Sequence, residues 1–557
     1  MIRYPRAILV TVNPMTPSSV QLSAEGYQLP QYSFSPPPEL SDAAVPRHAL
    51  IIVGGGLAGL TLACDLAQRG IHAVLLDEDD TVGVRGASSR GIVYAQRTLE
   101  IFAGLGIYSR IQDKGVTWSV GRTFDGDDEV YSFNRGAGNA SRQAAFINIQ
   151  QFYIEAFLVE RISALGVTDL RWRNRVTRMV SHEDHVELWV DTPAGSYRTE
   201  AQWLVDATGA NSALRDSMGL DTHASRSPDR WCITDVRFNK QFPSERWTWI
   251  RAPFNDDRAV WQHLMADEVW RVDFQMGPDA DPEYVSKPEV AAERLRAYLG
   301  QDLEFEFVWI GPYQYRDHLL DEFLVGRVFF IGDSAHVVSP FGARGGNSGV
   351  QDAANLGWKL SLALKGQAPQ ALLESYQTER HAAAVENLKV ASITARFLAS
   401  LSPIEQLFRD AVLGLAREHP FARGMVNTGR MSVGNAYPAS PLAPTGAWAL
   451  PNVEITLASG ERGGVLDLLQ GGFVAIVFAD SVPPALSHAQ LTAYACGSSP
   501  LTGIGDPQGQ LSKAARAGEG DMILLRPDGY CAGRWRRGDT AGLMATLDAY
   551  FGEGMTR

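Results

Sequence analysis

The chain has 557 residues, a mass of 60.8 kDa and a formal net charge of −13. A chain of this length is expected to form several domains, each with a core of its own. The acidic balance, without a block of basic residues, argues against nucleic acid and anionic membranes as partners. No apolar run reaches the roughly 18 residues of a membrane span, so we expect a cytoplasmic protein.

Residues 1 to 47 are predicted to form an extended N-terminal arm, because Pro30, Pro36 to Pro38 and Pro46 disfavour regular structure. The start of the chain has a faint likeness to a signal peptide, but its apolar segment from Ala7 to Val12 is short. Met15 is an alternative natural start, since nothing before it is needed by the fold that the later residues predict.

The first motif is the glycine run Gly54-Gly55-Gly56-Leu57-Ala58-Gly59, which follows the apolar segment Ala49 to Val53. The apolar segment predicts a strand buried in a parallel sheet, and a helix is expected after the glycines. Gly54 permits the tight turn, Gly56 lets the backbone approach a pyrophosphate, and Gly59 lets the helix pack on the strand. The free N–H groups at the helix start, around Leu57 and Ala58, favour a phosphate there.

A second strand is predicted over Ala73 to Leu76, and it ends at Asp77. Asp77 follows the first glycine at about the distance where an acidic side chain accepts hydrogen bonds from an adenosine ribose. The neighbouring Glu78, with further acidic residues behind it, disfavours a 2′-phosphate. The pattern therefore favours FAD or NAD over NADP, and a plain strand–turn–helix junction is the alternative interpretation.

A third stretch distinguishes FAD from NAD. The apolar strand Val328 to Ile331 ends at Gly332-Asp333, and the loop Pro340 to Asn347, with Gly345 and Gly346, precedes a helix predicted from Ser348 to Lys365. An aspartate at a strand end can accept a hydrogen bond from a ribityl hydroxyl, and the glycines bring bare backbone against a flat ring. The helix start directs positive partial charge at that ring. A Gly-Asp turn before an ordinary amphipathic helix is the alternative.

These stretches, in this order, resemble the aromatic-ring hydroxylases, the single-component flavoprotein monooxygenases of the para-hydroxybenzoate hydroxylase type. Weaker matches are Ser89-Arg90-Gly91, Gln151 with Glu155, and Tyr376 with Glu379-Arg380. The resemblance covers roughly residues 48 to 395. Family residues that match Arg90, Gln151 and Asp333 contact the flavin, so the resemblance implies those roles here.

The resemblance implies an α/β fold with a Rossmann-like FAD-binding domain, an inserted mixed-sheet substrate domain and a C-terminal thioredoxin-like domain. We expect the FAD-binding domain in residues 48–115, 145–222 and 322–395, the substrate domain in 116–144 and 223–321, a helical linker in 396–440 and the thioredoxin-like domain in 441–557. Within the substrate domain, segments 259–265 and 269–276 predict a hairpin that turns at Asp267-Glu268.

The four cysteines are isolated, with neither a C-x-x-C pair nor metal-ligand spacing, so no metal is expected. Without paired cysteines the thioredoxin-like domain cannot exchange disulfides, and its expected role is packing or formation of a homodimer.

One family motif is imperfect. The family has Asp-Gly-x-x-Ser-x-x-Arg where this chain has Thr208-Gly209, then Ser212 and Arg215. Thr208 lacks the carboxylate that in the family helps to hold the pyrophosphate and is linked to nicotinamide handling. Thr208 and Gly209 can still donate hydrogen bonds to a phosphate, so FAD binding remains the expectation.

The resemblance implies an enzyme in which NADH or NADPH reduces FAD, dioxygen then gives a flavin hydroperoxide, and a phenolic substrate takes its distal oxygen. The protein must orient the ring, exclude water and favour deprotonation of the phenol. The candidate catalytic residues are His263, Tyr313, His318 and Arg344, with Asp273, Gln275 and Tyr315 as further polar candidates. A satisfied core histidine is the alternative for His263, and His336 is expected to order its loop.

Small phenols or phenolic acids are the first expected substrates, and a polycyclic polyketide is the second. A flavin-dependent halogenase is an alternative, because Trp247-Thr-Trp249-Ile250 resembles a halogenase motif, although the Ile comes one place early and no Pro follows it. A flavin-bearing binding protein without turnover is the alternative that the departure at Thr208 favours.

Overall fold

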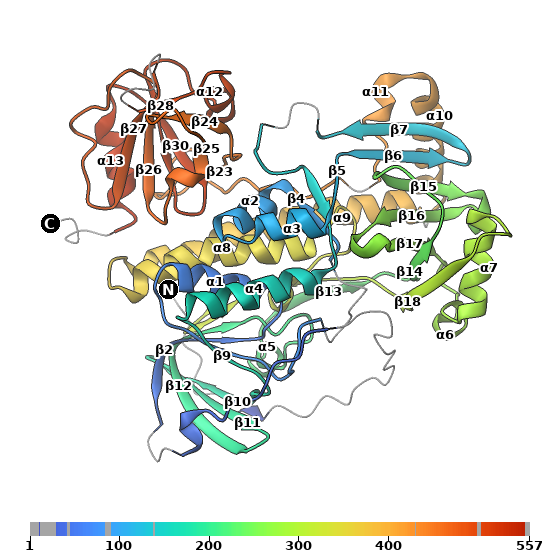
Figure 1. The fold of residues 1–557 in the computed structure, drawn as a ribbon, viewed down its shortest axis with the longest axis horizontal. Helices are drawn as coiled ribbons and strands as arrows, with labels where there is room; N and C mark the ends of the chain where they lie inside the picture. The colour runs from blue at the N-terminus through green and yellow to red at the C-terminus, as the bar shows by residue number, and fades with distance from the viewer. Residues whose placement is uncertain are drawn as a thin grey trace.

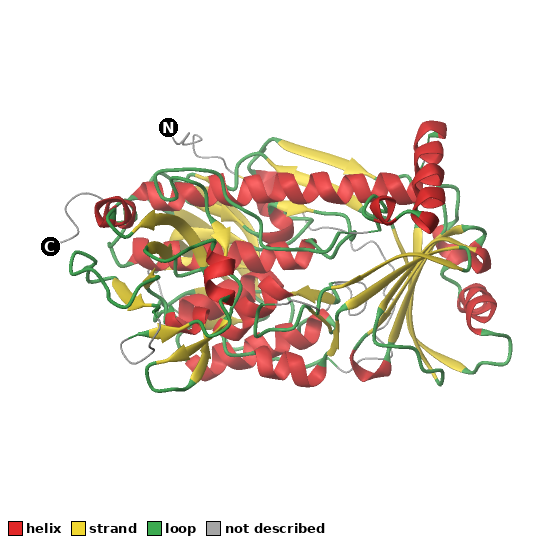
Figure 2. Cartoon of the chain, turned by 90° about the horizontal axis from the view of Figure 1, so that it is seen from above, coloured by secondary structure: helices red, strands yellow, loops and turns green. Residues whose placement is uncertain are grey.

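The computed structural model describes residues 10–11, 29–41, 45–83, 91–136, 140–400, 402–428, 430–497 and 503–551. Two long helices, α8 (Gly345–Leu364) and α9 (Gln370–Ala399), run through the central unit. A fan-shaped sheet lies at one end of these helices and a smaller C-terminal unit at the other (Figures 1 and 2). Most of the predicted N-terminal arm lies outside the described residues. Within the described residues, no helix has the length and apolar character needed to cross a membrane.

The central unit contains a nine-stranded sheet whose middle is parallel. Strands β21, β12, β2, β3 and β9 run parallel in that order, and β11, β10 and β1 extend the sheet antiparallel from the first half of β12. The apolar runs read from the sequence form β2, β3 and β21, and their side chains are almost all buried. The strands are β1 (Val10–Thr11), β2 (Arg47–Val53), β3 (Val74–Leu76), β9 (Asp169–Arg171), β10 (Arg175–Ser181), β11 (Val186–Thr192), β12 (Gly195–Asp206), β20 (Leu324–Val325) and β21 (Val328–Phe330).

Helices pack against this sheet, and short helices, strands and 3-10 turns complete the unit. Helix α1 (Leu57–Gln68) begins inside the glycine run, directly after Gly56, and α4 (Gln151–Leu165) packs beside it. Helix α8 begins at Gly345, three residues before the predicted start, so Gly345 and Gly346 form its first turn. The remaining elements are α2 (Gln96–Gly104), α3 (Tyr108–Lys114), α5 (Ala213–Ser217), β4 (Val93–Ala95), β5 (Val116–Trp118), β8 (Phe146–Asn148), β13 (Thr222–Arg226), β19 (Arg316–Leu320), β22 (His336–Val337) and the 3-10 turns η1 (Pro38–Leu40) and η4 (Gly332–Ser334).

The inserted sheet has the strand order β18-β14-β17-β16-β15-β6-β7. The predicted hairpin forms from β16 and β17, which turn through η3 (Ala266–Glu268). One face packs on helix α7 through Val272, Phe274 and Leu295, and the opposite face carries Trp231 and Trp261 toward the central unit. The elements are β6 (Val120–Asp125), β7 (Asp128–Asn134), β14 (Trp231–Phe238), β15 (Arg246–Ala252), β16 (Arg258–Leu264), β17 (Trp270–Gln275), β18 (Phe305–Tyr313), η2 (Pro253–Asn255), α6 (Pro282–Val285) and α7 (Pro288–Leu299).

The C-terminal unit is a five-stranded mixed sheet in the order β23-β30-β29-β26-β27, with a small second sheet of β25, β24 and β28. The apolar segment Phe473–Val477 forms β26, and the turn Pro527-Asp528-Gly529 joins β29 to β30. All four cysteines of the chain are buried and free. Helices α10 (Pro403–Glu418) and α11 (Pro420–Arg423) precede this unit in the chain and lie against the inserted sheet (Figure 1). The elements of the C-terminal unit are β23 (Trp448–Ala449), β24 (Glu454–Leu457), β25 (Arg462–Gly464), η5 (Val465–Leu468), β26 (Phe473–Val477), β27 (Leu491–Ala495), β28 (Ile504–Gly505), α12 (Gln510–Ala515), β29 (Asp521–Leu525), β30 (Tyr530–Arg536) and α13 (Thr540–Asp548).

Candidate functional site

The carboxyl ends of four parallel strands meet at one edge of the central sheet. In the strand register, Val53 lies opposite Leu76 on one side and Asp206 on the other, and Asp206 lies opposite Phe330. The glycine run, Asp77, the Thr208 turn and the Gly332 turn each follow one of these residues. Motifs far apart in the sequence therefore converge, at the edge where parallel α/β sheets bind ligands.

The glycine run has the local geometry that a pyrophosphate site needs. Gly54 has φ +111°, and a Cβ there would lie 2.4 Å from the carbonyl oxygen of Ala207. A Cβ on Gly59 would lie 2.0 Å from the carbonyl oxygen of Gly54, so the close approach of helix and strand requires glycine. Nothing lies within 4 Å of a Cβ built on Gly56. The crowded glycines therefore shape the turn, while Gly56 leaves open space at the start of α1, where a pyrophosphate fits.

Asp77 supports this turn from the neighbouring strand. Its Oδ2 accepts a hydrogen bond from the N–H of Gly55, and its Oδ1 accepts one from the N–H of Asp79 at 2.8 Å. The carboxylate of Glu78 lies 3.7 Å from Arg175. The predicted acidic strand end is thus held beside the glycine run.

The Thr208 turn is organised by a carboxylate that the sequence motif did not single out. Asp206 is fully buried and accepts hydrogen bonds from the backbone N–H of Thr208 at 2.9 Å and from its hydroxyl at 2.7 Å. Its second oxygen accepts a hydrogen bond from the hydroxyl of Ser212. Burial raises the pKa of Asp206. Gly209 has φ +88° and open space around its α-carbon, so this turn presents bare backbone next to the glycine run.

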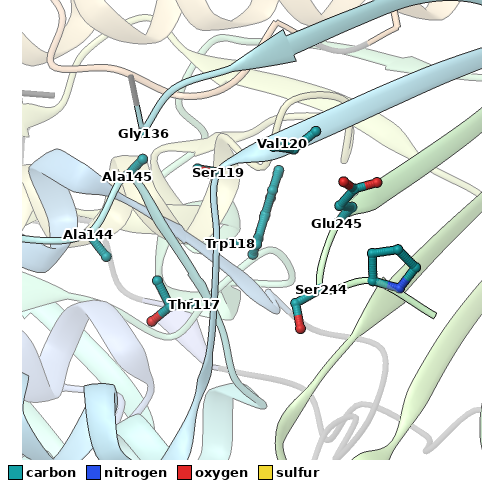
Figure 3. A pocket seen from close by; sticks show the side chains of 10 residues that line it. Thr117, Trp118, Ser119, Val120, Gly136, Ala144, Ala145, Ser244 and Glu245 are labelled. Atoms are coloured by element: carbon teal, nitrogen blue, oxygen red, sulfur yellow. The ribbon is translucent and has the colours of Figure 1, made fainter. Parts of the chain in front are cut away.

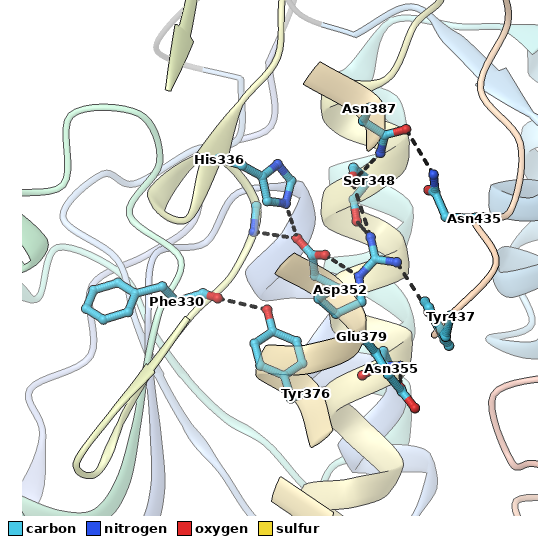
Figure 4. A network of polar contacts seen from close by, with 12 residues as sticks. Phe330, His336, Ser348, Asp352, Asn355, Tyr376, Glu379, Asn387, Asn435 and Tyr437 are labelled. Carbon is cyan, nitrogen blue, oxygen red and sulfur yellow. Dashed lines mark hydrogen bonds and ion pairs between the residues drawn. The ribbon is translucent and has the colours of Figure 1, made fainter. Parts of the chain in front are cut away.

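The Gly332 turn rests on a buried polar network (Figure 4). Asp352 on α8 accepts hydrogen bonds from the N–H of Gly332 at 3.0 Å and from Arg380 Nε at 2.6 Å, and its Oδ2 lies 2.7 Å from His336 Nε2. Burial alone would raise the pKa of Asp352, but the charges of Arg380 and His336 lower it to about 2. The turn that carries Asp333 is therefore tied to both long helices, and Asp333 itself is only partly buried.

The loop before α8 is fixed by Asn347 and Arg344. The Asn347 side chain accepts from the N–H of Ala95 at 2.9 Å and donates to the carbonyl oxygen of Val93 at 2.8 Å. Arg344 is buried and donates to Asn387 at 2.6 Å and to the carbonyl oxygen of Arg430 at 3.0 Å, and burial lowers its pKa to about 10. Of the other predicted loop residues, Pro340 is exposed and the glycines of the first α8 turn are half-buried.

The face of the inserted sheet that is turned toward this loop carries buried polar side chains. Arg271 forms two hydrogen bonds with Asp235, at 2.7 and 2.9 Å, and Arg246 donates to the carbonyl oxygen of Thr428 at 2.7 Å. His263 lies opposite Arg271 in the register, and Asp273 lies opposite Trp261. We call Asp235, Arg246, His263, Arg271 and Asp273 the polar cluster.

Two atoms of the polar cluster are buried without a hydrogen-bond partner among the described residues, His263 Nδ1 and Asp273 Oδ1. Burial, with Arg246 and Arg271 nearby, lowers the pKa of His263 well below its usual value. Burial raises the pKa of Asp273 to about 7, although Arg271 opposes this shift. Buried polar atoms usually have a hydrogen-bond partner, so these two atoms mark this face as a candidate ligand site.

Sequence reasoning named His263 and Asp273 but missed both arginines and Asp235. The signal that could have found Arg271 is its alternation with Asp273 and Gln275 along one face of an otherwise apolar strand. Arg246 comes from β15 and Asp235 from β14, and no local pattern joins them to this face.

The other predicted residues lie around this centre. Tyr313 ends β18 opposite Trp231, and His318 on β19 is buried, with its pKa lowered to about 4 by burial and by Arg215. Gln151 begins α4 and donates to Glu155 at 2.7 Å. Arg90 lies outside the described residues.

A cavity of about 480 Å³ is bordered by Trp118 at the end of β5 and by Glu245 just before β15 (Figure 3). Trp118 lies within its wall and stacks on Phe146 with ring centroids 4.5 Å apart. The same hydrophobic cluster contains Met265 and Met431, and Met431 contacts Arg246. The cavity is lined by Thr117, Trp118, Ser119, Val120, Gly136, Ala144, Ala145, Pro243, Ser244 and Glu245.

Comparisons with known proteins agree with this arrangement. The family model for an FAD binding domain matches residues 47–391, more than half of the chain. A 3-(3-hydroxy-phenyl)propionate/3-hydroxycinnamic acid hydroxylase of Mycolicibacterium smegmatis is 26% identical over 87% of this chain and 90% of its own length. A dialkyldecalin synthase of Streptomyces rugosporus is 27% identical over 90% of this chain and 98% of its own.

The solved structure of the flavin-dependent monooxygenase PieE, in complex with FAD and substrate, shares the fold. It superposes with a TM-score of 0.74 at 21% identity and covers 91% of this chain and all of its own. This likeness shows the fold, and the family model shows an FAD binding domain. The chain therefore belongs to the FAD binding domain family and is an FAD-dependent flavoprotein of the aromatic-ring hydroxylase type.

Proposed function

We propose that the chain hydroxylates a phenolic aromatic substrate, with NADH or NADPH as the reductant and dioxygen as the source of the added oxygen. The proposal is supported by the FAD-binding strand ends and by the relative that hydroxylates a hydroxyphenyl acid. FAD, when bound, supplies the redox chemistry and the activation of oxygen. The work left to the protein is to hold the cofactor, orient the ring, exclude water and take up a proton.

The residues that we propose to hold FAD are those that converge at the sheet edge. The open space at Gly56 and Gly209 suits the pyrophosphate, and Asp77 lies where an adenosine ribose would sit. The full set is Gly54, Gly56, Leu57, Ala58, Gly59, Asp77, Glu78, Arg90, Gln151, Thr208, Gly209, Asp333, Pro340, Gly345, Gly346 and Asn347.

The proposed substrate site is based on the polar cluster. A buried polar atom without a partner costs on the order of 1–3 kcal/mol, so His263 Nδ1 and Asp273 Oδ1 are costly unless a ligand pairs with them. The aromatic side chains Trp231, Trp261 and Phe341 pack together beside them. We place the substrate ring between the flavin loop and this face, with its hydroxyl toward the polar cluster.

Each polar residue has a distinct proposed role there. The Asp273 carboxylate takes up the proton of the phenol, because its pKa of about 7 keeps it a usable base at neutral pH. Arg246 and Arg271 lie close enough to Asp273 to lower its pKa, and their positive charges would stabilise the phenolate. His263, neutral because its pKa is lowered, would orient the substrate by a hydrogen bond.

The remaining sequence candidates are proposed to act around this centre. Tyr313, at the end of β18, packs against the hydrophobic cluster that contains Trp231, Trp261 and Phe341. His318 shapes the space beside the Gly332 turn, where it pairs in the sheet with Val337. Arg344 positions the flavin loop, since its guanidinium already donates to Asn387 and to backbone carbonyls.

A panel of simple phenols and phenolic acids, with polycyclic phenols as a second set, tests this function. We expect the purified yellow holoenzyme to oxidise NADH or NADPH faster when the right phenol is present, and to yield a product heavier by one oxygen atom. A protein that oxidises neither nucleotide with any phenol of the panel would contradict the proposal.

A second candidate function is a flavoprotein that binds its ligand without net oxidation. It is favoured by the dialkyldecalin synthase among the relatives, whose name describes no hydroxylation. Such a protein would bind FAD and a polycyclic ligand but would not consume NADH or NADPH. The phenol panel therefore separates the two candidates.

A further inference from the structure

An exposed apolar surface lies on the helices that follow the FAD-binding unit. Within the described residues, six large apolar side chains between positions 404 and 425 are exposed by 42% to 80%. They are Ile404, Leu407, Phe408, Leu415, Phe421 and Met425. We call them the apolar patch.

Four of the six side chains of the apolar patch form one stripe along α10. Positions 404, 407, 408, 411 and 415 recur at the three- and four-residue spacing of a single helix side, and Ala411 in their middle is also exposed. Phe421 lies on α11, which follows α10 directly at the edge of the molecule, and Met425 lies just beyond α11 (Figure 1). Helix α10 is thus apolar on two sides, because Val412, Leu413 and Ala416 are buried on the other.

The area of the patch is that of a protein interface. A large side chain offers on the order of 200 Å², so the six exposed fractions leave roughly 700 Å² of apolar surface. The largest patch on a typical monomer is about 300–600 Å², whereas each partner in a standard interface buries about 800 Å². A surface of this size is expected to be covered in solution.

We infer that the apolar patch is the contact surface between two copies of this chain. A twofold dimer is the commonest closed assembly, and it requires a patch that complements itself. The exposed charged residues of α10 include both signs, Asp410 and Glu418 with Arg417, so α10 presents no block of like charge to a second copy. A lipid surface fits less well, because α10 carries more acidic than basic residues and the whole chain has a charge of −13.

The contact bears on the substrate site through the other side of α10. Val412, Leu413 and Ala416 belong to the hydrophobic cluster that includes Trp231, Trp261 and Phe341. A partner bound to the apolar patch would therefore hold α10 in place against Trp231, Trp261 and Phe341. This inference is independent of the proposed reaction, since it concerns assembly alone.

Light scattering during gel filtration of the holoenzyme tests the inference. At tens of micromolar, we expect the wild type at twice the chain mass of 60.8 kDa, and Leu407→Glu/Phe408→Glu at the mass of one chain with its FAD retained. The control Tyr284→Glu changes an exposed aromatic residue elsewhere and should stay at twice the mass. A monomeric wild type, a double variant that remains dimeric, or a monomer that sediments with phosphatidylcholine vesicles would overturn the inference.

A cysteine cross-link gives a second measurement that does not depend on the folding of the charged variant. All four native cysteines are buried, so Ala411→Cys adds an exposed thiol at the middle of the stripe. We expect a short bis-maleimide to yield a covalent dimer from Ala411→Cys and none from Tyr284→Cys. Equal cross-linking of both variants, or none in Ala411→Cys, would contradict the proposed contact.

Discussion

At the scale of single residues, two glycines of one motif differ in what surrounds their α-carbons. A methyl group on Gly59 would collide with the backbone of Gly54, whereas a methyl group on Gly56 would meet only open space. Gly59 is therefore needed by the fold of the apoprotein. Gly56, whose φ of −84° any residue can adopt, is needed only if a ligand occupies that space.

The two glycines give a matched pair of variants. Gly56→Ala should leave the melting temperature of the apoprotein unchanged and weaken FAD binding about tenfold or more, a cost of about 1.4 kcal/mol. Gly59→Ala should destabilise the apoprotein by about 1–3 kcal/mol, because backbone must shift to admit the methyl group. FAD titration and thermal unfolding of the apoproteins measure both effects, and equal FAD affinity in Gly56→Ala and wild type would place the pyrophosphate elsewhere.

Asp273 gives the predicted pH dependence. Its carboxyl is neutral below about pH 7 and charged above, so a base at this position makes kcat rise as the pH increases through about 7. Asp273→Asn should lose this inflection and lower kcat by about 100-fold. The exposed Asp279→Asn is the control. A kcat profile in Asp273→Asn that keeps the wild-type inflection would exclude Asp273 as the base.

The raised pKa of Asp273 also makes the stability of the substrate-free protein depend on pH. The folded protein favours the neutral form of Asp273 over the charged form. The contribution of this neutral carboxyl to the free energy of unfolding is complete below the unfolded pKa of about 4. It is lost as the pH rises toward the folded pKa of about 7. Asp273→Asn stays neutral throughout. The melting temperature of Asp273→Asn relative to wild type should therefore increase between pH 4 and pH 7, and a constant difference would mean that the pKa is not raised.

Single residues also show what the sequence could and could not predict. The glycine run, Asp77 and Gly332 were predictable because each motif follows its own apolar strand. The polar cluster was predictable only in part, since Arg246 and Asp235 reach it from other strands. Asp206 was visible at a strand end, but its bonds to Thr208 and Ser212 depend on a turn that the motif alone did not define.

At the scale of elements, the Gly332 turn depends on contacts between α8 and α9. Asp352 and Arg380 are separated by 28 residues, and both are fully buried. Tyr376 adds a hydrogen bond to the carbonyl oxygen of Phe330 at 2.8 Å (Figure 4). The weaker family match at Tyr376 and Arg380 thus marks the support of the turn, a role that spacing alone could not reveal.

Removing Arg380 should therefore cost much more than removing an exposed arginine of the same helix. Arg380→Met leaves the buried Asp352 without its main partner, and we expect a loss of about 3–5 kcal/mol. Arg396→Met removes an exposed pair with Glu405 and should cost at most about 1 kcal/mol. Chemical unfolding of both variants checks this, and similar losses would show that the network is dispensable.

At the scale of the whole molecule, the C-terminal unit is attached through buried charge. Arg526, in the turn between β29 and β30, donates to Glu379 on α9 at 2.6 and 3.0 Å, and Trp358 of α8 packs against Phe473 and Tyr550. The sequence around this turn shows a Pro-Asp-Gly pattern, but Arg526 finds its partner 147 residues away, which no local pattern reveals. Buried ion pairs and aromatic packing therefore join the unit to both long helices.

Arg526→Met should loosen this attachment, because it leaves the negative charge of the buried Glu379 compensated only by Lys359. We expect limited proteolysis to release a C-terminal fragment several-fold faster than from wild type. Arg534→Met, which removes a half-exposed arginine of the same unit, should behave as wild type. Equal resistance of both variants would mean that apolar packing alone holds the unit.

We propose above all that this FAD-binding chain transfers oxygen from dioxygen to an aromatic ring. The most direct measurement is a single incubation of the FAD-loaded enzyme with NADH or NADPH, the phenol that best stimulates it and isotopically labelled dioxygen. We predict a product that carries one labelled oxygen atom on the ring. A product without label, or consumption of the nucleotide with all of the phenol recovered unchanged, would contradict the account.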